Sequence, residues 1–478
     1  MFFRFFSFKI FFFFLTLFVN DIFSQKSSDF IYQELGNYVI KNYDNTFLDR
    51  PESIWSIIKS KNEKLVYYGT FNGIIEYDGN KIRKINVQGQ IENEVGSEYV
   101  RNMIQTESGE IFVSGPSVMG VLLNNEFASK EYISLLTQIP DSINPYQQNF
   151  LGIKEFQNKI YSSTPEKIFR WDGQRFDKIW AFTDYEGSIN SKGKLHFLFK
   201  VGERLFIRQW GIGLLELIDD KFQFVEGSEF YSNNRIESMF STSENRISIF
   251  SSTNGAYFLN KDGTFTKSKN KLLNKWLIES KVQYVSELPS FNDGSIPIIS
   301  NNGILILDNN LNIINLIDES DGLLSSQITS MFIDDNDDMF VTNLLSSAKI
   351  DFDNSLTEFD RTEGVKGVVT KIKRLNNQIY FSTTEDIFSL KPNNDPLKNA
   401  SINEIGLDDY VRDFTNFNNS IVSTNNYGVI EYNRNSIKKV TSDRDINLPT
   451  PSKLSDNILI ISHPSDGIVL LKKNKKGI

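Results

Sequence analysis

The sequence predicts an all-β fold, a β-propeller of about ten four-stranded blade repeats. One apolar pattern recurs roughly every 40 to 50 residues, the period of propeller blades. Each expected strand is short, rich in Ile, Val, Phe and Tyr, and bounded by Asn, Asp, Gly or Ser. Long helical periodicity is hard to find, and the best helical candidate is the short segment 269–279. Because so small a sheet cannot bury both faces alone, successive sheets are expected to pack around an axis.

The first repeat, 53–85, holds all four strands of the unit. An apolar strand leads into a polar turn, a second strand ends at Gly69-Thr70, and Asp78-Gly79 joins the third strand to the fourth. Such Asp-Gly pairs suit tight hairpins that need positive φ. Small residues recur after the second strand, where inner strands crowd together, and this favours a structural role over catalysis. The repeated positions are Thr70, Ser114, Ser163, Ser252, Ser300, Thr342, Thr383 and Thr424.

The repeats divide the chain after the leader into two parts. Residues 25–366 are expected to form a propeller of about seven blades, and residues 367–478 hold three further blade repeats. Three blades cannot close a ring, so two interpretations follow. Residues 367–478 begin a truncated second propeller, or the segment 37–43 completes the tenth blade and closes one large ring. The first is favoured, because rings of more than eight blades are uncommon.

The N-terminus predicts export. Arg4 and Lys9 supply positive charge, residues 10–19 are apolar apart from Thr16, and residues 22–25 offer a cleavage site. Residues 1–24 are therefore interpreted as a signal peptide, which places the mature chain in the periplasm or cell envelope. The alternative is a retained N-terminal anchor helix.

Composition excludes several classes of function. The net charge of −9 and the pI of about 5.1 argue against nucleic-acid binding, which depends on Lys and Arg displacing counterions. With no cysteine there is no disulfide, thiolate metal site or thiol nucleophile. No cofactor motif is present, and none is expected.

The first repeat resembles the two-component regulator propeller repeat. In the segment 38–85 the matching residues are Gly69-Thr70, Gly73-Ile74-Ile75 and Tyr77-Asp78-Gly79. A second match spans 319–343, where Asp321-Gly322-Leu323 resembles the family's link between blades. The Trp that the family usually carries in the second strand is absent here.

The resemblance implies an extracytoplasmic sensor that binds a small-molecule or carbohydrate ligand and passes the signal to a membrane-anchored signalling domain, in a longer chain or a partner. The output domain is not visible in this chain. His463, in Ser-His-Pro, lies on a repeat's turn without helical pattern, which favours a structural or surface role over a phospho-acceptor. His196 is expected in the core or at a strand edge.

Candidate ligand-binding residues are departures from the repeat at the turn after the second strand. The fourth copy carries Arg208, Gln209 and Trp210 where other copies carry small residues, and an Arg beside a Trp could hydrogen-bond and stack on a sugar. Asn72, Asn426 and Tyr427 occupy the corresponding turn in the first and ninth copies. Blade-specific packing is the structural alternative.

Two other functions stay open at this stage. A propeller-fold lyase or glycoside hydrolase needs carboxylates that converge in space, which a sequence does not show. A protein-interaction scaffold needs neither. The segment 334–338, Asp-Asp-Asn-Asp-Asp, begins like a calcium loop but lacks its turn Gly and distal Glu, so no metal site is predicted.

Overall fold

The structure is a computed structural model that divides into two compact units, Tyr38–Leu356 and Met1–Asn37 with Thr357–Ile478. The first unit ends before residue 366, the boundary expected from the repeats. The residues that the structure describes are 34, 36–43, 53–61, 65–87, 97–126, 129–181, 194–242, 246–284, 288–352, 357–361, 363–393, 398–407, 409–418, 420–426, 428–433, 436–441, 446–463 and 465–473. The predicted signal peptide lies outside these residues.

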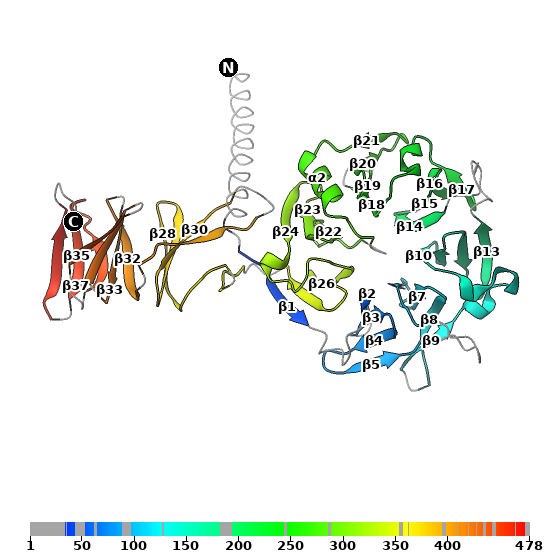
Figure 1. Ribbon diagram of the computed structural model, residues 1–478, viewed down its shortest axis with the longest axis horizontal. Helices are drawn as coiled ribbons and strands as arrows, with labels where there is room; N and C mark the ends of the chain where they lie inside the picture. The colour runs from blue at the N-terminus through cyan, green and yellow to red at the C-terminus, as the bar shows by residue number, and fades with distance from the viewer. Residues whose placement is uncertain are drawn as a thin grey trace, which may run out of the picture. The chain divides into compact units, whose positions relative to one another are not determined.

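The unit Tyr38–Leu356 is a propeller ring of seven antiparallel sheets in its described part (Figure 1). In five of the sheets four consecutive strands form a meander, running from the innermost strand to the outermost. The first sheet contains β2(Ile54–Lys59), β3(Val66–Thr70), β4(Gly73–Tyr77) and β5(Ile82–Ile85), and the second contains β6(Asn102–Gln105), β7(Ile111–Gly115), β8(Val118–Asn124) and β9(Lys130–Ser134). The third contains β10(Gly152–Phe156), β11(Lys159–Ser163), β12(Lys167–Trp171) and β13(Phe176–Ala181), and the fourth contains β14(Leu195–Val201), β15(Arg204–Gln209), β16(Gly213–Ile218) and β17(Lys221–Phe224). The fifth contains β18(Ser238–Ser241), β19(Ile247–Ser251), β20(Gly255–Leu259) and β21(Phe265–Lys267).

The sixth and seventh sheets depart from that simple meander. The sixth has three assigned strands, β22(Ile296–Ser300), β23(Gly303–Leu307) and β24(Ile313–Ile317), and only an isolated bridge from Val282 to Ser300 where its innermost strand would lie. The seventh contains β25(Ser330–Ile333), β26(Asp338–Thr342) and β27(Ser347–Asp351). The prediction of an all-β propeller built of blade repeats is confirmed.

The fourth strand of the seventh sheet comes from the start of the chain. β1(Val39–Tyr43) pairs antiparallel with β27, with Val39 opposite Asp351 and Tyr43 opposite Ser347. The ring is therefore closed by joining the N-terminal strand to the last blade of the unit. The alternative in which segment 37–43 completes a tenth blade is wrong, because the edge that this strand occupies belongs to the seventh sheet.

The hydrophobic core of the ring lies between neighbouring sheets. Phe112 and Met119 of the second sheet pack with Ile153 and Phe169 of the third, and comparable clusters join other neighbours. A further cluster joins the ends of the ring, where Ile57 of the first sheet packs with partly buried Phe332 and Phe340 of the seventh. Burying such a side chain stabilises the fold by about 1.5–3 kcal/mol, so each sheet depends on its neighbours.

The small hydroxyl residues after the second strand close the tight turns. The Thr70 hydroxyl donates to the carbonyl oxygen of Gly73 at 3.0 Å and accepts from the N–H of Asn72 at 3.1 Å. Ser300 makes the same two bonds in the sixth sheet. Their side chains are fully buried, and these bonds give them a structural role in the turn. In the fifth sheet the turn is closed by Ser251, not by Ser252 as the spacing suggested.

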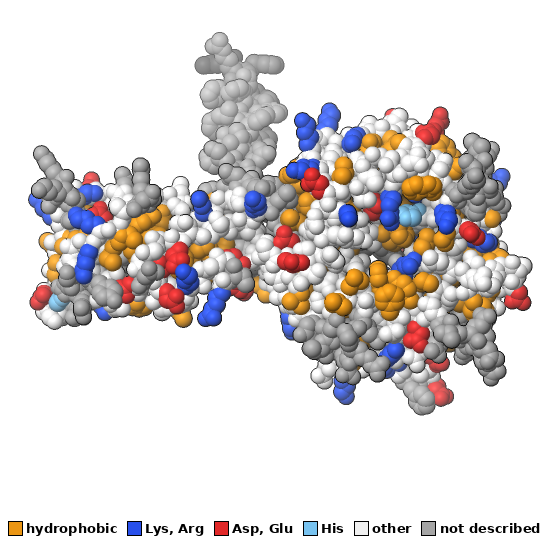
Figure 2. All heavy atoms as spheres, viewed as in Figure 1, with side chains coloured by type: hydrophobic (Ala, Val, Ile, Leu, Met, Phe, Trp, Pro, Cys, Tyr) orange, Lys and Arg blue, Asp and Glu red, His pale blue; other side chains and the backbone are white. Residues whose placement is uncertain are grey.

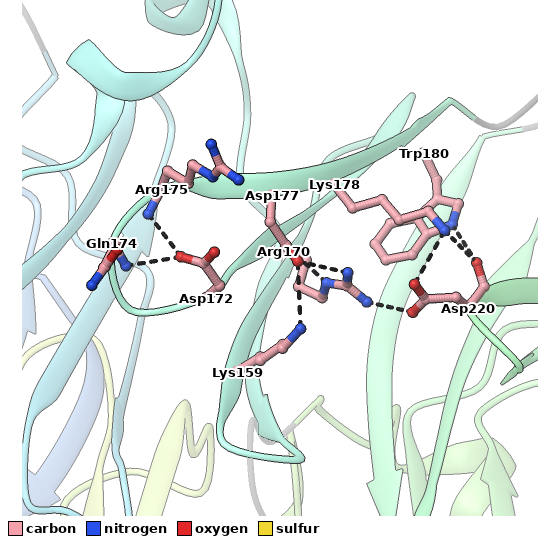
Figure 3. A network of polar contacts seen from close by, with 9 residues as sticks. All are labelled: Lys159, Arg170, Asp172, Gln174, Arg175, Asp177, Lys178, Trp180 and Asp220. Atoms are coloured by element: carbon pink, nitrogen blue, oxygen red, sulfur yellow. Dashed lines mark hydrogen bonds and ion pairs between the residues drawn. The ribbon is translucent and has the colours of Figure 1, made fainter.

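A network of ion pairs joins the third and fourth sheets (Figure 3). Arg170 of β12 binds both carboxylate oxygens of Asp177 at 2.8 and 2.7 Å and also pairs with Asp220, in the turn between β16 and β17. Trp180 donates its indole N–H to the carbonyl oxygen of Asp220 at 3.1 Å, and the Arg170 guanidinium lies over the Trp180 ring. The sequence gives no signal for this network, because its partners come from two blades.

The second unit contains three blade-like sheets in its described residues. They are β28(Val369–Leu375), β29(Gln378–Thr383), β30(Ile387–Lys391) and β31(Ser401–Glu404); β32(Val411–Phe417), β33(Ser420–Asn425), β34(Gly428–Asn433) and β35(Ser436–Thr441); and β36(Asn447–Pro451), β37(Ile458–His463) and β38(Gly467–Lys472). Consecutive sheets again share cores, such as the cluster of Val422 and Val429 with Leu459 and Ile461.

Helical structure among the described residues is short. The expected helix 269–279 is present as α2(Lys271–Glu279), capped by the Asn270 side chain, which accepts from the N–H of Leu273 at 3.0 Å. Within the described part of the chain, no helix combines the length and apolar character needed to cross a membrane. The 3-10 turns are η2(Leu136–Gln138), η3(Asp141–Ile143), η4(Pro145–Gln147), η5(Glu229–Ser232) and η6(Glu319–Asp321).

Candidate ligand-binding site

We call the face of the ring on which innermost strands begin and second strands end the front face. A pocket of about 460 Å³ opens there, lined by residues just before and at the start of β14, around the end of β15 and before β18. Figure 2 shows Lys and Arg side chains gathered around a histidine on the ring, with hydrophobic side chains nearby. The lining residues of this front pocket are Lys194, Leu195, His196, Arg208, Trp210 and Arg235.

Arg208 forms the inner wall of the front pocket. Its side chain is almost fully buried, and its Nε and Nη2 donate to the carbonyl oxygens of Tyr231 and Ser232 at 2.9 and 3.0 Å. Burial, with the positive charge of Arg235 nearby, lowers the pKa of Arg208 to about 10, so it stays protonated at neutral pH. The buried charge is thus held by main-chain oxygens.

Trp210 forms the exposed rim of the front pocket. The Arg208 guanidinium lies 4.4 Å from the centre of its ring, while 46% of the residue is open to solvent. The main-chain N–H of Trp210 donates to the carbonyl oxygen of Lys194 at 2.8 Å. Gly211, the next residue, turns the chain with a φ of +80°. A Trp that is held by an arginine and still has nearly half of its surface open can stack on a flat or apolar ligand.

His196 is the second residue of β14 and lies half-buried in the front pocket, close to the expected strand position. Its Nδ1 is buried without a hydrogen-bond partner among the described atoms. Burial, together with the charges of Arg235 and Arg208, lowers the pKa of His196 to about 3. The imidazole is therefore neutral at the pH of most environments, and one ring nitrogen can donate while the other accepts.

We expect acid to destabilise the ring through His196. Between pH 6.5 and about 3 the unfolded chain binds a proton at this residue that the folded chain does not, so the free energy of unfolding falls as the pH drops, by about 2 kcal/mol at pH 5. Urea unfolding at pH 7 and pH 5 measures this loss, and His196→Asn should reduce it. An imidazole of His196 that titrates near 6.5 by NMR would contradict the expectation.

The structure brings together only some of the predicted site residues. Arg208 and Trp210 line one pocket, whereas Gln209 is fully buried and is absent from the lining. Asn72 is exposed in the turn between β3 and β4 and does not line the front pocket. Asn426 follows β33 in the second unit, where its side chain lies 3.5 Å from both Asp409 and Arg412. Tyr427 lies outside the described residues.

Sequence reasoning missed an aromatic cluster on the front face. Trp55 in β2, Phe71 in the turn after β3 and Tyr99 before β6 have ring centres 4.4 to 5.7 Å apart. Phe71 is 45% exposed, and the Arg101 guanidinium lies 5.3 Å from the Tyr99 ring centre. The sequence did carry a signal for this cluster, because Phe71 stands next to Asn72 in the turn from which only Asn72 was predicted to bind a ligand.

A second pocket of about 310 Å³ opens where innermost strands end, on the opposite face of the ring. Its lining alternates in charge, with Lys61, Lys154 and Lys200 beside Glu107 and Glu155. Glu155 accepts from the N–H of Glu107 at 2.9 Å, which joins the third sheet to the second. This lining mixes both signs of charge and has no exposed aromatic ring, so it is a weaker candidate for a ligand site.

The remaining candidates are engaged in structure. In the segment 334–338, Asp334 accepts from Lys59 Nζ at 2.8 Å, and Asp337 accepts from the N–H of Asn292. Within the described ranges no group of three or more His, Asp or Glu side chains is placed to hold a metal ion. His463 ends β37 almost fully buried, and its Nδ1 accepts from the N–H of Ser465 and Asp466. It closes a turn as Thr70 does.

Comparison with known proteins identifies the fold. The chain is similar to the extracellular domain of a hybrid two-component system of B. thetaiotaomicron, with a TM-score of 0.62 and 14% identity, covering 92% of this chain and 61% of that one. A second such domain from that organism gives 0.49 and 13%, covering 91% and 58%. Virginiamycin B lyase from Staphylococcus aureus gives 0.48 and 13%, covering 65% and 98%.

At 14% identity, the likeness to the first of these domains, with its TM-score of 0.62, shows a shared fold. No family model matches the chain, and no curated protein matches it. The chain spans about 61% of the length of the first hybrid two-component domain. This one likeness therefore supports the architecture and shows nothing of the activity.

Proposed function

We propose that this chain is the ligand-sensing propeller of an extracytoplasmic two-component-type regulator. The observation that carries the proposal is the front pocket, where a partly exposed Trp210 packs against a buried Arg208 on the front face of the ring. A rigid aromatic beside fixed polar donors is a common way to bind a small molecule or oligosaccharide. The similar structure with the TM-score of 0.62, an extracellular domain of a hybrid two-component system, supports the same function.

We also propose how the signal leaves the ligand site. Residues 1–24 direct export, the three sheets of Thr357–Ile478 begin a second propeller, and a membrane-anchored signalling domain receives the signal. Three sheets present two end faces that a ring would cover. Ile468 and Leu470 on β38, the outermost strand, are 72% and 61% exposed, and a further blade packed against that last sheet would bury them.

Trp210→Ala tests the binding site. We expect the purified chain to bind at least one member of a panel of neutral and acidic oligosaccharides, and the variant to bind it about tenfold more weakly, because removing a Trp anchor commonly costs more than 1 kcal/mol. Isothermal titration calorimetry measures the affinity, and Ile218→Ala, an exposed residue at the far end of β16, is the control. Equal affinities of Trp210→Ala and the unaltered chain would contradict this placement of the site.

A lyase or hydrolase would give a different result with the same mixture of purified chain and oligosaccharide. The bound oligosaccharide would be consumed over time, and chromatography would show new products. A scaffold would instead bind none of the panel. Stable binding without turnover is the outcome that the sensor proposal expects.

A further inference from the structure

We infer that the front pocket selects a ligand bearing an anionic group, a carboxylate or a sulfate. The inference rests on the proposed function, because it names the chemistry of the ligand bound at that site. Three of the six lining residues are cationic, Lys194, Arg208 and Arg235, and none is acidic. They come from three different segments, before β14, at the end of β15 and before β18, and the fold brings them together.

The acid beside the pocket does not balance these charges. Glu237 pairs with Arg235 at 3.5 Å but does not line the pocket. Its carboxylate is buried and accepts from the N–H and hydroxyl of Ser252 at 2.8 and 2.7 Å. Burial also raises the pKa of Glu237. One buried carboxylate thus faces several positive charges, and the pocket keeps a net positive potential.

Hydrogen-bond donors are available at the same place. A guanidinium has five N–H groups, and main-chain oxygens take two of those of Arg208. The other three have no protein acceptor among the described residues. His196 adds a buried Nδ1 without a partner, and leaving such an atom unsatisfied costs about 1–3 kcal/mol. A carboxylate or sulfate offers two or more oxygens to such donors, and charge-assisted bonds of this kind are strong.

Packing alone explains only part of this arrangement. Arg208 can be a structural residue, because it stacks on Trp210 and caps two carbonyl groups. Lys194 is exposed and the Arg235 side chain is 52% exposed, yet both add positive charge beside a buried arginine. The lowered pKa values of His196 and Arg208, for which burial is the larger cause and neighbouring arginines the next, fit a positive site.

The experiment compares charged probes with their neutral counterparts. Calorimetry is run with trigalacturonate and its methyl ester, and with a sulfated disaccharide and its desulfated form, at 50 and 500 mM salt. We expect at least one acidic probe to bind at least tenfold more tightly than its neutral form, and to weaken at the higher salt concentration because the charges are screened. Lys194→Gln and Arg235→Gln should each weaken that acidic probe about five- to tenfold and leave neutral probes unchanged.

Lys261→Gln, in the exposed turn between β20 and β21, is the matched control and should change nothing. Both pocket substitutions lie on exposed side chains, so circular dichroism should show an unaltered fold. If neutral probes bind as tightly as acidic ones, or if neither pocket variant changes the affinity of the acidic probe, the anion inference is wrong while the sensor proposal stands. If no probe of either kind binds, both are wrong.

Discussion

Replacing Ile40 and Lys41 in β1 by proline is expected to open the ring and to lower its free energy of unfolding by about 3 kcal/mol or more, because it removes ladder bonding and the apolar contacts of the strand. In an antiparallel pair, adjacent residues point their N–H groups alternately toward and away from the partner strand. Ile40 lies opposite Ile350, and Lys41 opposite Lys349. The double variant therefore removes at least one N–H that pairs with β27, whichever position faces it.

The expected loss exceeds that of one strand because β1 closes the ring. Ile40 and Tyr38 pack against the core of the sixth and seventh sheets, and the Tyr38 ring stacks on Phe352 at 4.9 Å. Freeing this strand exposes that core and loosens the contact between the seventh and first sheets. Urea unfolding followed by near-ultraviolet circular dichroism measures the loss, and limited proteolysis should cleave the variant faster.

A second double proline variant is the control. Thr266 and Lys267 lie in β21, the outermost strand of the fifth sheet, where they pair with Phe258 and Tyr257 of β20. Proline at both positions removes comparable ladder bonds but leaves the ring closed, so a smaller loss is expected. Equal unfolding midpoints for the two double variants would show that β1 has no special role in closure.

Why β1 joins the seventh sheet could not be predicted from its own residues. Val39–Tyr43 is a short, half-buried strand, and such a strand fits the edge of any blade. The choice depends on the number of sheets between the two ends of the ring, hence on how neighbouring sheets twist and pack, which a period of 40 to 50 residues does not encode.

The local elements were more predictable. A tight turn forms at Asp78 and Gly79 as expected, but its two central residues are Gly79 and Asn80, since the N–H of Asp78 donates to the carbonyl oxygen of Lys81. Only Gly79 has a positive φ, of +94°, which glycine tolerates. Other hairpins use less obvious pairs, such as Asp219-Asp220 and Asn376-Asn377, with φ values of +48° to +63°. There the turn is imposed by the strands on either side, and the residues only need to tolerate it.

The sequence predicted only part of the candidate site. Arg208 and Trp210 stand out because they interrupt a position that is small elsewhere. Lys194 and Arg235 are ordinary surface cations in sequence, and only the ring brings them to one pocket. A repeat reveals its departures within a blade, whereas a site between blades is assembled by packing.

Arg170→Met is expected to lower the free energy of unfolding by about 2–3 kcal/mol, because it leaves two carboxylates of the network between the third and fourth sheets without their main partner (Figure 3). Methionine keeps apolar contact with Trp180 but offers no donor. The loss falls short of that for a fully buried pair, since the Asp220 side chain is 52% exposed and Lys159 still faces Asp177.

The dependence of this loss on pH separates it from simple packing damage. The side-chain bonds of Arg170 hold the pKa values of Asp177 and Asp220 below their ordinary value of 3.8. Their contribution is therefore complete above about pH 4 and disappears as the pH falls through the lowered values, so the gap between variant and unaltered chain should narrow in acid. Arg204→Met is the matched control, because Arg204 of β15 binds Glu216 of β16 in the same sheet with the same two-bond geometry and is 41% exposed, and it should lose less than about 1 kcal/mol. A similar loss for both variants at pH 7 would mean that the link between the two sheets adds nothing to the stability of the ring.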